Sequence, residues 1–167
     1  MHDLCNPLRI DVPRGGSKIA SVDLYPSLPE DGEAAAWPMA DVTDHQFCPF
    51  SGLVVGFDVE STADERHYEQ AVLVIHIAQK VQTDVGRWSF FMSGIQYEPG
   101  RGDTQHDIDT QVSADGQTLT MTLRNVGVDN EAVDFSYLAL YRDRQSGECQ
   151  IYTSKDPSIR IGRPPAP

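Results

Sequence analysis

Hydrophobic and polar residues alternate along several stretches of the chain, a pattern that predicts half-buried β-strands. In residues 117–124, Leu119, Met121 and Leu123 share one face, and three threonines share the other. Residues 107–112 alternate in the same way. The Asp115–Gly116 pair between these stretches is typical of a tight turn, because glycine accepts a positive φ. The pattern therefore predicts a hairpin over residues 107–124.

Other segments extend this picture. Residues 71–78 are apolar on both faces and rich in β-branched side chains, which predicts a central strand. Helical signals are limited to single turns at 31–37 and 62–70. Further strands are predicted at 9–12, 17–25, 52–60, 87–92, 131–141, 149–153 and 158–161. We therefore predict an all-β fold, a two-sheet antiparallel β-sandwich of immunoglobulin-like type with an irregular N-terminal arm.

The predicted strands are distributed unevenly, which suggests a division of the chain. Residues 26–51 contain four prolines and little alternation. We expect residues 1–51 to form an N-terminal elaboration or arm packed on the core, and residues 52–161 to form the sandwich domain. Residues 162–167 are expected to be a proline-rich tail, because proline cannot donate to a strand ladder. The pattern leaves open whether the arm belongs to the sandwich.

Composition and charge narrow the possible functions. The chain has 167 residues, with 25 acidic and 13 basic side chains and a formal net charge of −12. This length suits one domain with a core that needs no disulfide or metal. The negative charge argues against nucleic acid and anionic membranes as partners, because both attract lysine and arginine. Its spread over loops and outward strand faces is typical of a surface that keeps a protein soluble.

The expected compartment and the expected state of the cysteines rest on three features that the sequence lacks: a secretory pattern, a membrane-spanning segment and closely spaced cysteines. Its first residues show no secretory pattern, and no segment has the roughly 20 apolar residues that cross a bilayer. We therefore expect a soluble, cytoplasmic protein. Cys5, Cys48 and Cys149 include no pair at metal-binding spacing, so three free thiols are expected. A Cys5–Cys48 disulfide remains open.

Several short motifs lie in the second part of the chain. They are the strand, Asp-Pro and proline-ended tail of 151–164, the strings 91–95 and 97–99, the 113–119 hairpin and the apolar strand around Phe135. Together they resemble the motifs of the DP-EP family of small bacterial β-sandwich proteins, over about residues 52–164. The resemblance implies a compact sandwich of uncharacterised function and assigns no functional residue.

Catalytic signatures are missing from the sequence. No Gly-x-Ser-x-Gly string occurs, and none of the five histidines is paired at the spacing of a metalloprotease helix. His76 lies in the apolar stretch 71–78, where a buried, hydrogen-bonded histidine is expected. We therefore expect a protein that is not an enzyme and that carries no cofactor.

Two groups of residues are candidates for binding. Trp88, Tyr97 and Tyr137 are aromatic residues that could line a ligand face, although large aromatic residues more often fill cores. Asp103, Asp107 and Asp109 gather three carboxylates in seven residues and could hold a weak divalent cation, although such a cluster is more often surface charge alone.

Two functional hypotheses follow. The first is a non-enzymatic interaction or structural module that forms a homo-oligomer, or binds another protein, through an aromatic or edge-strand surface. The alternative is a sandwich that binds a small ligand or carbohydrate.

Overall fold

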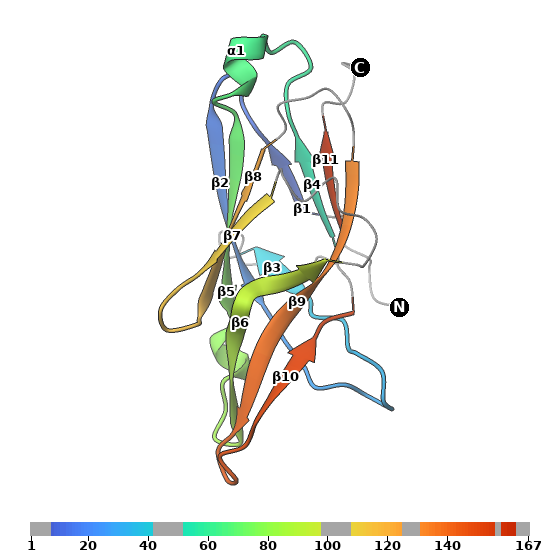
Figure 1. Cartoon of the computed structure of the whole chain (residues 1–167), viewed down its shortest axis with the longest axis vertical. Coiled ribbons are helices and arrows are strands. Elements are labelled where there is room, and N and C mark those ends of the chain that lie inside the picture. Colours follow the sequence, from blue (N-terminus) through green and yellow to red (C-terminus); the bar gives the residue numbers. More distant parts are fainter. Residues whose placement is uncertain (1–7, 42–51, 98–107, 125–130, 156–157, 163–167) are drawn as a thin grey trace.

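A computed structural model describes residues 8–41, 52–97, 108–124, 131–155 and 158–162. In these residues, strands form two sheets that face one another, and helical structure is limited to two single turns (Figure 1). The all-β prediction is confirmed. Neither helical turn in the described part of the chain is long or apolar enough to span a membrane.

The larger sheet has six strands and includes both the first and the last strand of the described chain. Its main path runs β1-β4-β11-β9-β10, and β6 pairs with β9 outside that path. Its members are β1 (Leu8–Asp11), β4 (Gly52–Gly56), β6 (Gly86–Tyr97), β9 (Glu131–Asp143), β10 (Cys149–Thr153) and β11 (Ser158–Gly162).

The smaller sheet has five strands in the order β3-β2-β5-β8-β7. A single helical turn, α1 (Ala63–Arg66), precedes β5, and a 3₁₀ turn, η1 (Gln79–Val81), follows it. The strands are β2 (Ser17–Leu24), β3 (Met39–Asp41), β5 (Gln70–Ile77), β7 (Ile108–Val112) and β8 (Thr118–Leu123).

Both sheets are mixed, so the prediction of an antiparallel sandwich is wrong in this respect. β4 is parallel to both of its neighbours, β1 and β11, and β2 is parallel to β5 along its whole length. Alternation with period two indicates which side chains share a face, but it carries no information about the direction of the neighbouring strand. Long connections, such as the one from β2 to β5, make the parallel pairs possible.

The N-terminal segment is not an irregular arm where it is described. β1 lies at the edge of the larger sheet, whereas β2 pairs with β3 and β5 in the smaller one. β1, β2 and β3 are therefore part of the two sheets. Strands were predicted at 9–12 and 17–25, but a local pattern does not show which sheet a strand joins, and the prolines of 26–51 obscured the short pattern of β3. The finer, immunoglobulin-like arrangement stays a prediction.

The predicted hairpin over 107–124 is confirmed by β7 and β8, which pair in antiparallel register. Gly116 adopts the positive φ, +74°, that this turn requires. β5 is central, as predicted, with β2 and β8 as neighbours. A helical turn forms within 62–70, as α1, but not within 31–37, where Glu30 and Glu33 make an isolated β-bridge instead.

The hydrophobic core fills the space between the sheets. Each face contributes side chains that are almost completely buried, and each large one adds about 1.5–3 kcal/mol by leaving water. From the smaller sheet they include Leu24, Leu73, Ile75, Leu119, Met121 and Leu123; from the larger sheet they include Leu53, Val55, Phe135, Tyr137, Ile159 and Ile161.

Candidate functional site

One side of the sandwich is closed by hydrogen bonds that cross from β6 to the turn between β7 and β8. The Phe90 N–H donates to the carbonyl of Gly116 at 2.7 Å. The Trp88 carbonyl accepts from the side-chain amides of Gln82 and Gln117, at 2.9 and 3.0 Å. The Trp88 N–H donates to the side-chain oxygen of Gln82 at 2.8 Å. These contacts give the edge of β6 partners from the β7–β8 turn of the opposite sheet and from Gln82, which follows η1.

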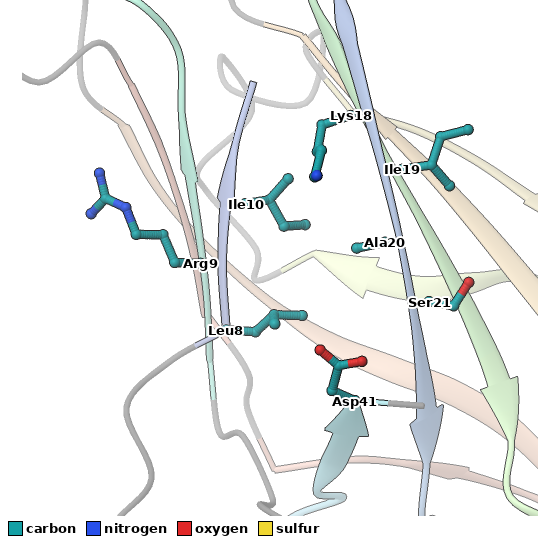
Figure 2. A pocket seen from close by; sticks show the side chains of 8 residues that line it. All are labelled: Leu8, Arg9, Ile10, Lys18, Ile19, Ala20, Ser21 and Asp41. Atoms are coloured by element: carbon teal, nitrogen blue, oxygen red, sulfur yellow. The ribbon is translucent and has the colours of Figure 1, made fainter. Parts of the chain in front are cut away.

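The other side, between β1 and β2, is open. Leu8 and Ile10 point from β1 across a gap towards Lys18 and Ala20 of β2, and Asp41 projects into the gap from the end of β3 (Figure 2). The resulting cleft has a volume of about 430 Å³. Its middle is apolar, and a lysine and an aspartate lie near opposite ends.

The direction of the backbone groups of β2 can be read from its flanking hydrogen bonds. The carbonyls of Gly16 and Leu24 accept from Gln70 and Ala78, beside β5, whereas the Tyr25 N–H donates to Pro38, beside β3. Because successive residues of a strand direct their N–H and C=O groups to opposite sides, even-numbered residues face β5 and odd-numbered residues face the outer edge.

Only part of that outer edge is covered. Among the described residues, β3 pairs with positions 22–24 of β2 and with none of positions 17–21. In the described part of the chain, no strand therefore lies beside the outward backbone groups of Ser17, Ile19 and Ser21. None of these three side chains is charged, and Ile19 is 66% exposed. We call these three residues the β2 edge.

The edge of β1 has a different character. The Val12 N–H donates to Gly56 of β4, which directs the backbone groups of Arg9 and Asp11 outwards. The side chains of Arg9 and Asp11 pair at 2.9 Å and are both exposed. Charged side chains on an edge strand oppose pairing with another chain. β1 therefore has a protected edge, and the β2 edge lacks this protection.

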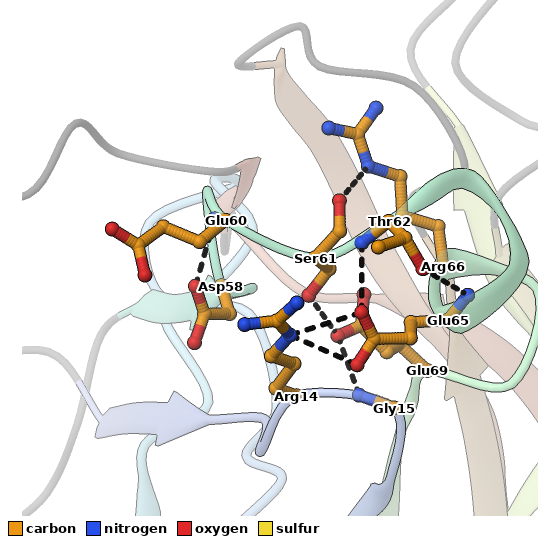
Figure 3. Close-up of polar contacts among 9 residues, drawn as sticks. All are labelled: Arg14, Gly15, Asp58, Glu60, Ser61, Thr62, Glu65, Arg66 and Glu69. Carbon is orange, nitrogen blue, oxygen red and sulfur yellow. Dashed lines mark hydrogen bonds and ion pairs between the residues drawn. The ribbon is translucent and has the colours of Figure 1, made fainter.

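A polar clamp holds the turn between β1 and β2 against the segment around α1 (Figure 3). Glu69 is completely buried, and one of its carboxyl oxygens accepts from the Gly15 N–H at 2.9 Å and from the Ser61 hydroxyl at 2.5 Å. The Arg14 side chain donates to both carboxyl oxygens of Glu65 at 2.9 Å. The clamp fixes β1 and β2 relative to one another at one end of the cleft.

The same segment is stabilised by a capping box at α1. Thr62 accepts from the Glu65 N–H, and the Glu65 carboxylate accepts from the Thr62 N–H. This backbone hydrogen bond, together with Arg14, holds the pKa of Glu65 below its ordinary value. The hydrogen bond to Glu65 in turn raises the pKa of Arg14. Arg66 donates to the Ser61 carbonyl at 3.1 Å, which ties α1 to the clamp.

The aromatic residues proposed to bind a ligand lie mainly in the core. Tyr137 is completely buried and its hydroxyl donates to the Met39 sulfur at 2.9 Å. Trp88 is 4% exposed and its ring contacts Trp37 at a centroid distance of 5.4 Å. Tyr97 is half-buried, and burial raises its pKa. These positions favour a packing role over an exposed aromatic face, because the larger rings do not reach the surface.

The predicted cation site is covered only in part. Asp103 and Asp107 lie outside the described residues, and Asp109 is exposed on β7, with a carboxyl oxygen 3.9 Å from Arg124. Within the described ranges, no group of three or more His, Cys, Asp or Glu side chains is placed to hold a metal. The cation site stays a prediction.

Other residues singled out in the sequence do not form a reactive group in the described chain. His76 is half-buried rather than buried, on the outer face of β5, and its Nδ1 lies 3.2 Å from the Thr118 hydroxyl. Cys149 is free and exposed, whereas Cys5 and Cys48 lie outside the described residues.

The cleft and the clamp were not found by sequence reasoning. Clamp partners such as Gly15 and Glu69 are far apart in the chain, so no local motif contains them. One signal was available: Lys18 shares its strand face with Ala20, Val22 and Leu24. An inward-facing charge in an otherwise apolar strand face is a recognised mark of a sheet edge.

Comparison with known proteins gives a family and a distant structural likeness. A family model described as the DP-EP family matches residues 7–163, which include β1, β2 and β3 as well as the region 52–164. A search of curated proteins found no match. Among solved structures, an inclusion body protein from Burkholderia cenocepacia J2315 aligns with a TM-score of 0.43 and 8% identity, covering 89% of this chain and 96% of that chain.

Proposed function

The chain belongs to the DP-EP family, and we propose that it is a non-enzymatic structural protein that associates with copies of itself through the open side of the sandwich. The observation that carries this proposal is the β2 edge, three outward-facing residues whose backbone has no strand beside it in the described chain. An edge of this kind is a template for pairing with another chain.

The distribution of charge supports association at this edge rather than elsewhere. Two copies that each carry a net charge of −12 repel one another, so a stable contact needs a surface without negative charge. Ser17, Ile19 and Ser21 provide such a surface, and Ile19 offers an exposed apolar side chain at its centre. Charged residues are depleted at the cores of protein interfaces for the same reason.

Sedimentation velocity over a wide range of protein concentration tests this proposal. We expect the weight-average mass to rise with concentration, and to rise further when salt is added, because salt screens the repulsion between the acidic copies. A mass that stays at the monomer value at every concentration and salt level would contradict the proposed function.

A further inference from the structure

We infer that Asp31 and Gly32 form a modification site, at which the folded chain converts Asp31 into an isoaspartyl residue without the help of an enzyme. This inference is independent of the proposed self-association. The sequence contains two Asp-Gly pairs, Asp31–Gly32 and Asp115–Gly116. Such pairs are prone to this reaction, because glycine has no Cβ to shield the backbone nitrogen that attacks. The structure leaves the first pair free to react and restrains the second.

The reaction is an isomerisation that needs only water. The backbone nitrogen of Gly32 bonds to Cγ of Asp31, and the hydroxyl group of the neutral carboxyl leaves with the amide proton as water. The product is a five-membered succinimide ring, whose nitrogen is bonded to both carbonyls. A water molecule then adds to one carbonyl and breaks its bond to that nitrogen. Addition at the α-carbonyl leaves Gly32 attached through Cγ, so composition and net charge are unchanged but the main chain is one atom longer.

The Asp31–Gly32 turn reaches the geometry of the ring with little movement. On either side of it, Glu30 and Glu33 exchange backbone hydrogen bonds of 3.0 and 2.9 Å. The φ angle is +52° at Asp31 and +80° at Gly32, and positive φ at both central residues defines a type I′ turn. Flipping the central peptide group gives a type II′ turn, which keeps the positive φ of Asp31. This flip brings the Gly32 nitrogen to the side of the Asp31 side chain and keeps the flanking hydrogen bonds.

The surroundings of this turn leave room for the flip. Among the described residues, neither the Asp31 carboxylate nor the Gly32 N–H has a hydrogen-bond partner. Apart from the adjacent residues, no atom of the described chain lies within 4 Å of the position that a Cβ on Gly32 would take. Both residues are exposed, in the segment between β2 and β3 that extends away from the two sheets (Figure 1). The site therefore has space for the ring and water for its hydrolysis.

The Asp115–Gly116 pair is restrained at both groups that the reaction uses. The Asp115 carboxylate accepts from the Ser113 hydroxyl at 2.6 Å and from the Gln117 N–H at 3.1 Å. These hydrogen bonds lower the pKa of Asp115, which keeps its carboxyl group ionised and a poorer target for attack. The Gly116 N–H donates to the Ser113 carbonyl at 2.9 Å, so turning this nitrogen towards Cγ breaks a hydrogen bond. The second pair is therefore a matched control within the same chain.

Incubation of the folded chain in heavy-oxygen water at mildly acidic pH, followed by peptide mass spectrometry, tests the site. Hydrolysis of the ring inserts one heavy oxygen atom, and resistance to an endoproteinase that cuts before aspartate but not before isoaspartate identifies the product. We expect the peptide with Asp31 to gain label at least about tenfold faster than the peptide with Asp115, because several hydrogen bonds must break at Asp115. In urea, where the fold is lost, the two rates should become similar.

Two variants, each checked for folding by circular dichroism, separate the roles of the two turns. Gly32→Ala shields the attacking nitrogen and is expected to remove most of the labelling at Asp31. Ser113→Ala removes a hydrogen bond from the Asp115 carboxylate and is expected to speed labelling there about threefold or more, with Asp31 unchanged. A folded original chain that labels neither pair, or both at the same rate, would overturn the inference. An Asp115 rate that Ser113→Ala leaves unchanged would contradict the protection assigned to that hydroxyl.

Discussion

Replacing Glu69 by alanine tests whether the buried carboxyl group of the clamp stabilises the fold. Glu69 is completely buried, and one carboxyl oxygen accepts from both the Ser61 hydroxyl and the Gly15 N–H. Glu69→Ala removes this acceptor from the Ser61 hydroxyl and the Gly15 N–H. The two donors differ in how accessible they are to water. Ser61 is 4% exposed, whereas Gly15 lies in a half-buried turn.

The magnitude follows from that burial. A buried donor that loses its acceptor costs about 1–3 kcal/mol. We expect the full range for Ser61 and the lower end for Gly15, where water can replace part of the lost bond. The expected fall in the free energy of unfolding for Glu69→Ala is therefore about 2–4 kcal/mol. Glu69→Gln keeps one acceptor oxygen and is expected to lose less.

Equilibrium unfolding in urea, followed by tryptophan fluorescence, measures these changes. Glu65→Ala is the matched control, because Glu65 belongs to the same clamp but reaches solvent, and its expected loss is smaller. All variants are compared at one protein concentration, since self-association adds to apparent stability. If Glu69→Ala unfolds within about 0.5 kcal/mol of the original chain, within the range typical of surface substitutions, the clamp does not stabilise the fold.

Further predictions concern strain, close packing and pH. A Cβ at Gly86 would lie 2.1 Å from the Tyr141 ring, so Gly86→Ala is expected to cost about 1–3 kcal/mol in urea unfolding and much less in a Tyr141→Ala background. Met92 has a φ of +54° and is 76% exposed, so Met92→Gly is expected to stabilise the chain and Met92→Val to destabilise it, by up to about 1 kcal/mol each in the same assay. Burial raises the pKa of Tyr137, so its contribution to stability is lost as pH rises above about 10, and Tyr137→Phe should flatten that loss in alkaline unfolding curves. The pKa of Glu65 is lower in the folded chain, so its ionised carboxylate stabilises the fold at pH values above its ordinary pKa of about 4.3. This stabilisation is lost as pH falls through the lower pKa of the folded chain, so Glu65→Gln should reduce the acid dependence of the unfolding midpoint.

Local patterns were sufficient to predict most strands and the hairpin. The alternation in β8 reflects one buried and one partly exposed face, and Gly116 has the positive φ that the turn requires. The same reasoning located β5, because its β-branched residues suit a strand with neighbours on both sides. These features depend on the residues of a single segment, and a single sequence contains that information.

The pairing partner of each strand, and whether the pair is parallel or antiparallel, could not be predicted, because both depend on residues far apart in the chain. The parallel pairing of β1 with β4 joins positions such as Leu8 and Leu53, and nothing in either strand specifies the other. The interruption of β6 between Phe90 and Ile95 is a similar case. It shifts the register against β9, so that both Trp88 and Ile95 face the core although their positions differ in parity.

The candidate site lay beyond sequence reasoning for the same reason. Its clamp joins Gly15 to Glu69, and among the described residues β3 covers only three positions of β2. The aromatic ligand face stays a prediction. Trp88 and Phe90 are two positions apart in β6, and only the assembled sheets show that both side chains pack inwards. Lys18, whose side chain enters the cleft, was the one local sign of an edge that could have been used.

Amide hydrogen exchange along β2, measured at low and high protein concentration, tests pairing at this edge most directly. The even-numbered residues Lys18 and Ala20 face β5 and are expected to exchange slowly at both concentrations. Ile19 and Ser21 face the open edge, so their amides should exchange quickly in dilute protein and slowly in concentrated protein. Slow exchange that appears with concentration only in the odd-numbered residues would support the account. Fast exchange of Ile19 at a concentration where the protein is dimeric would contradict it.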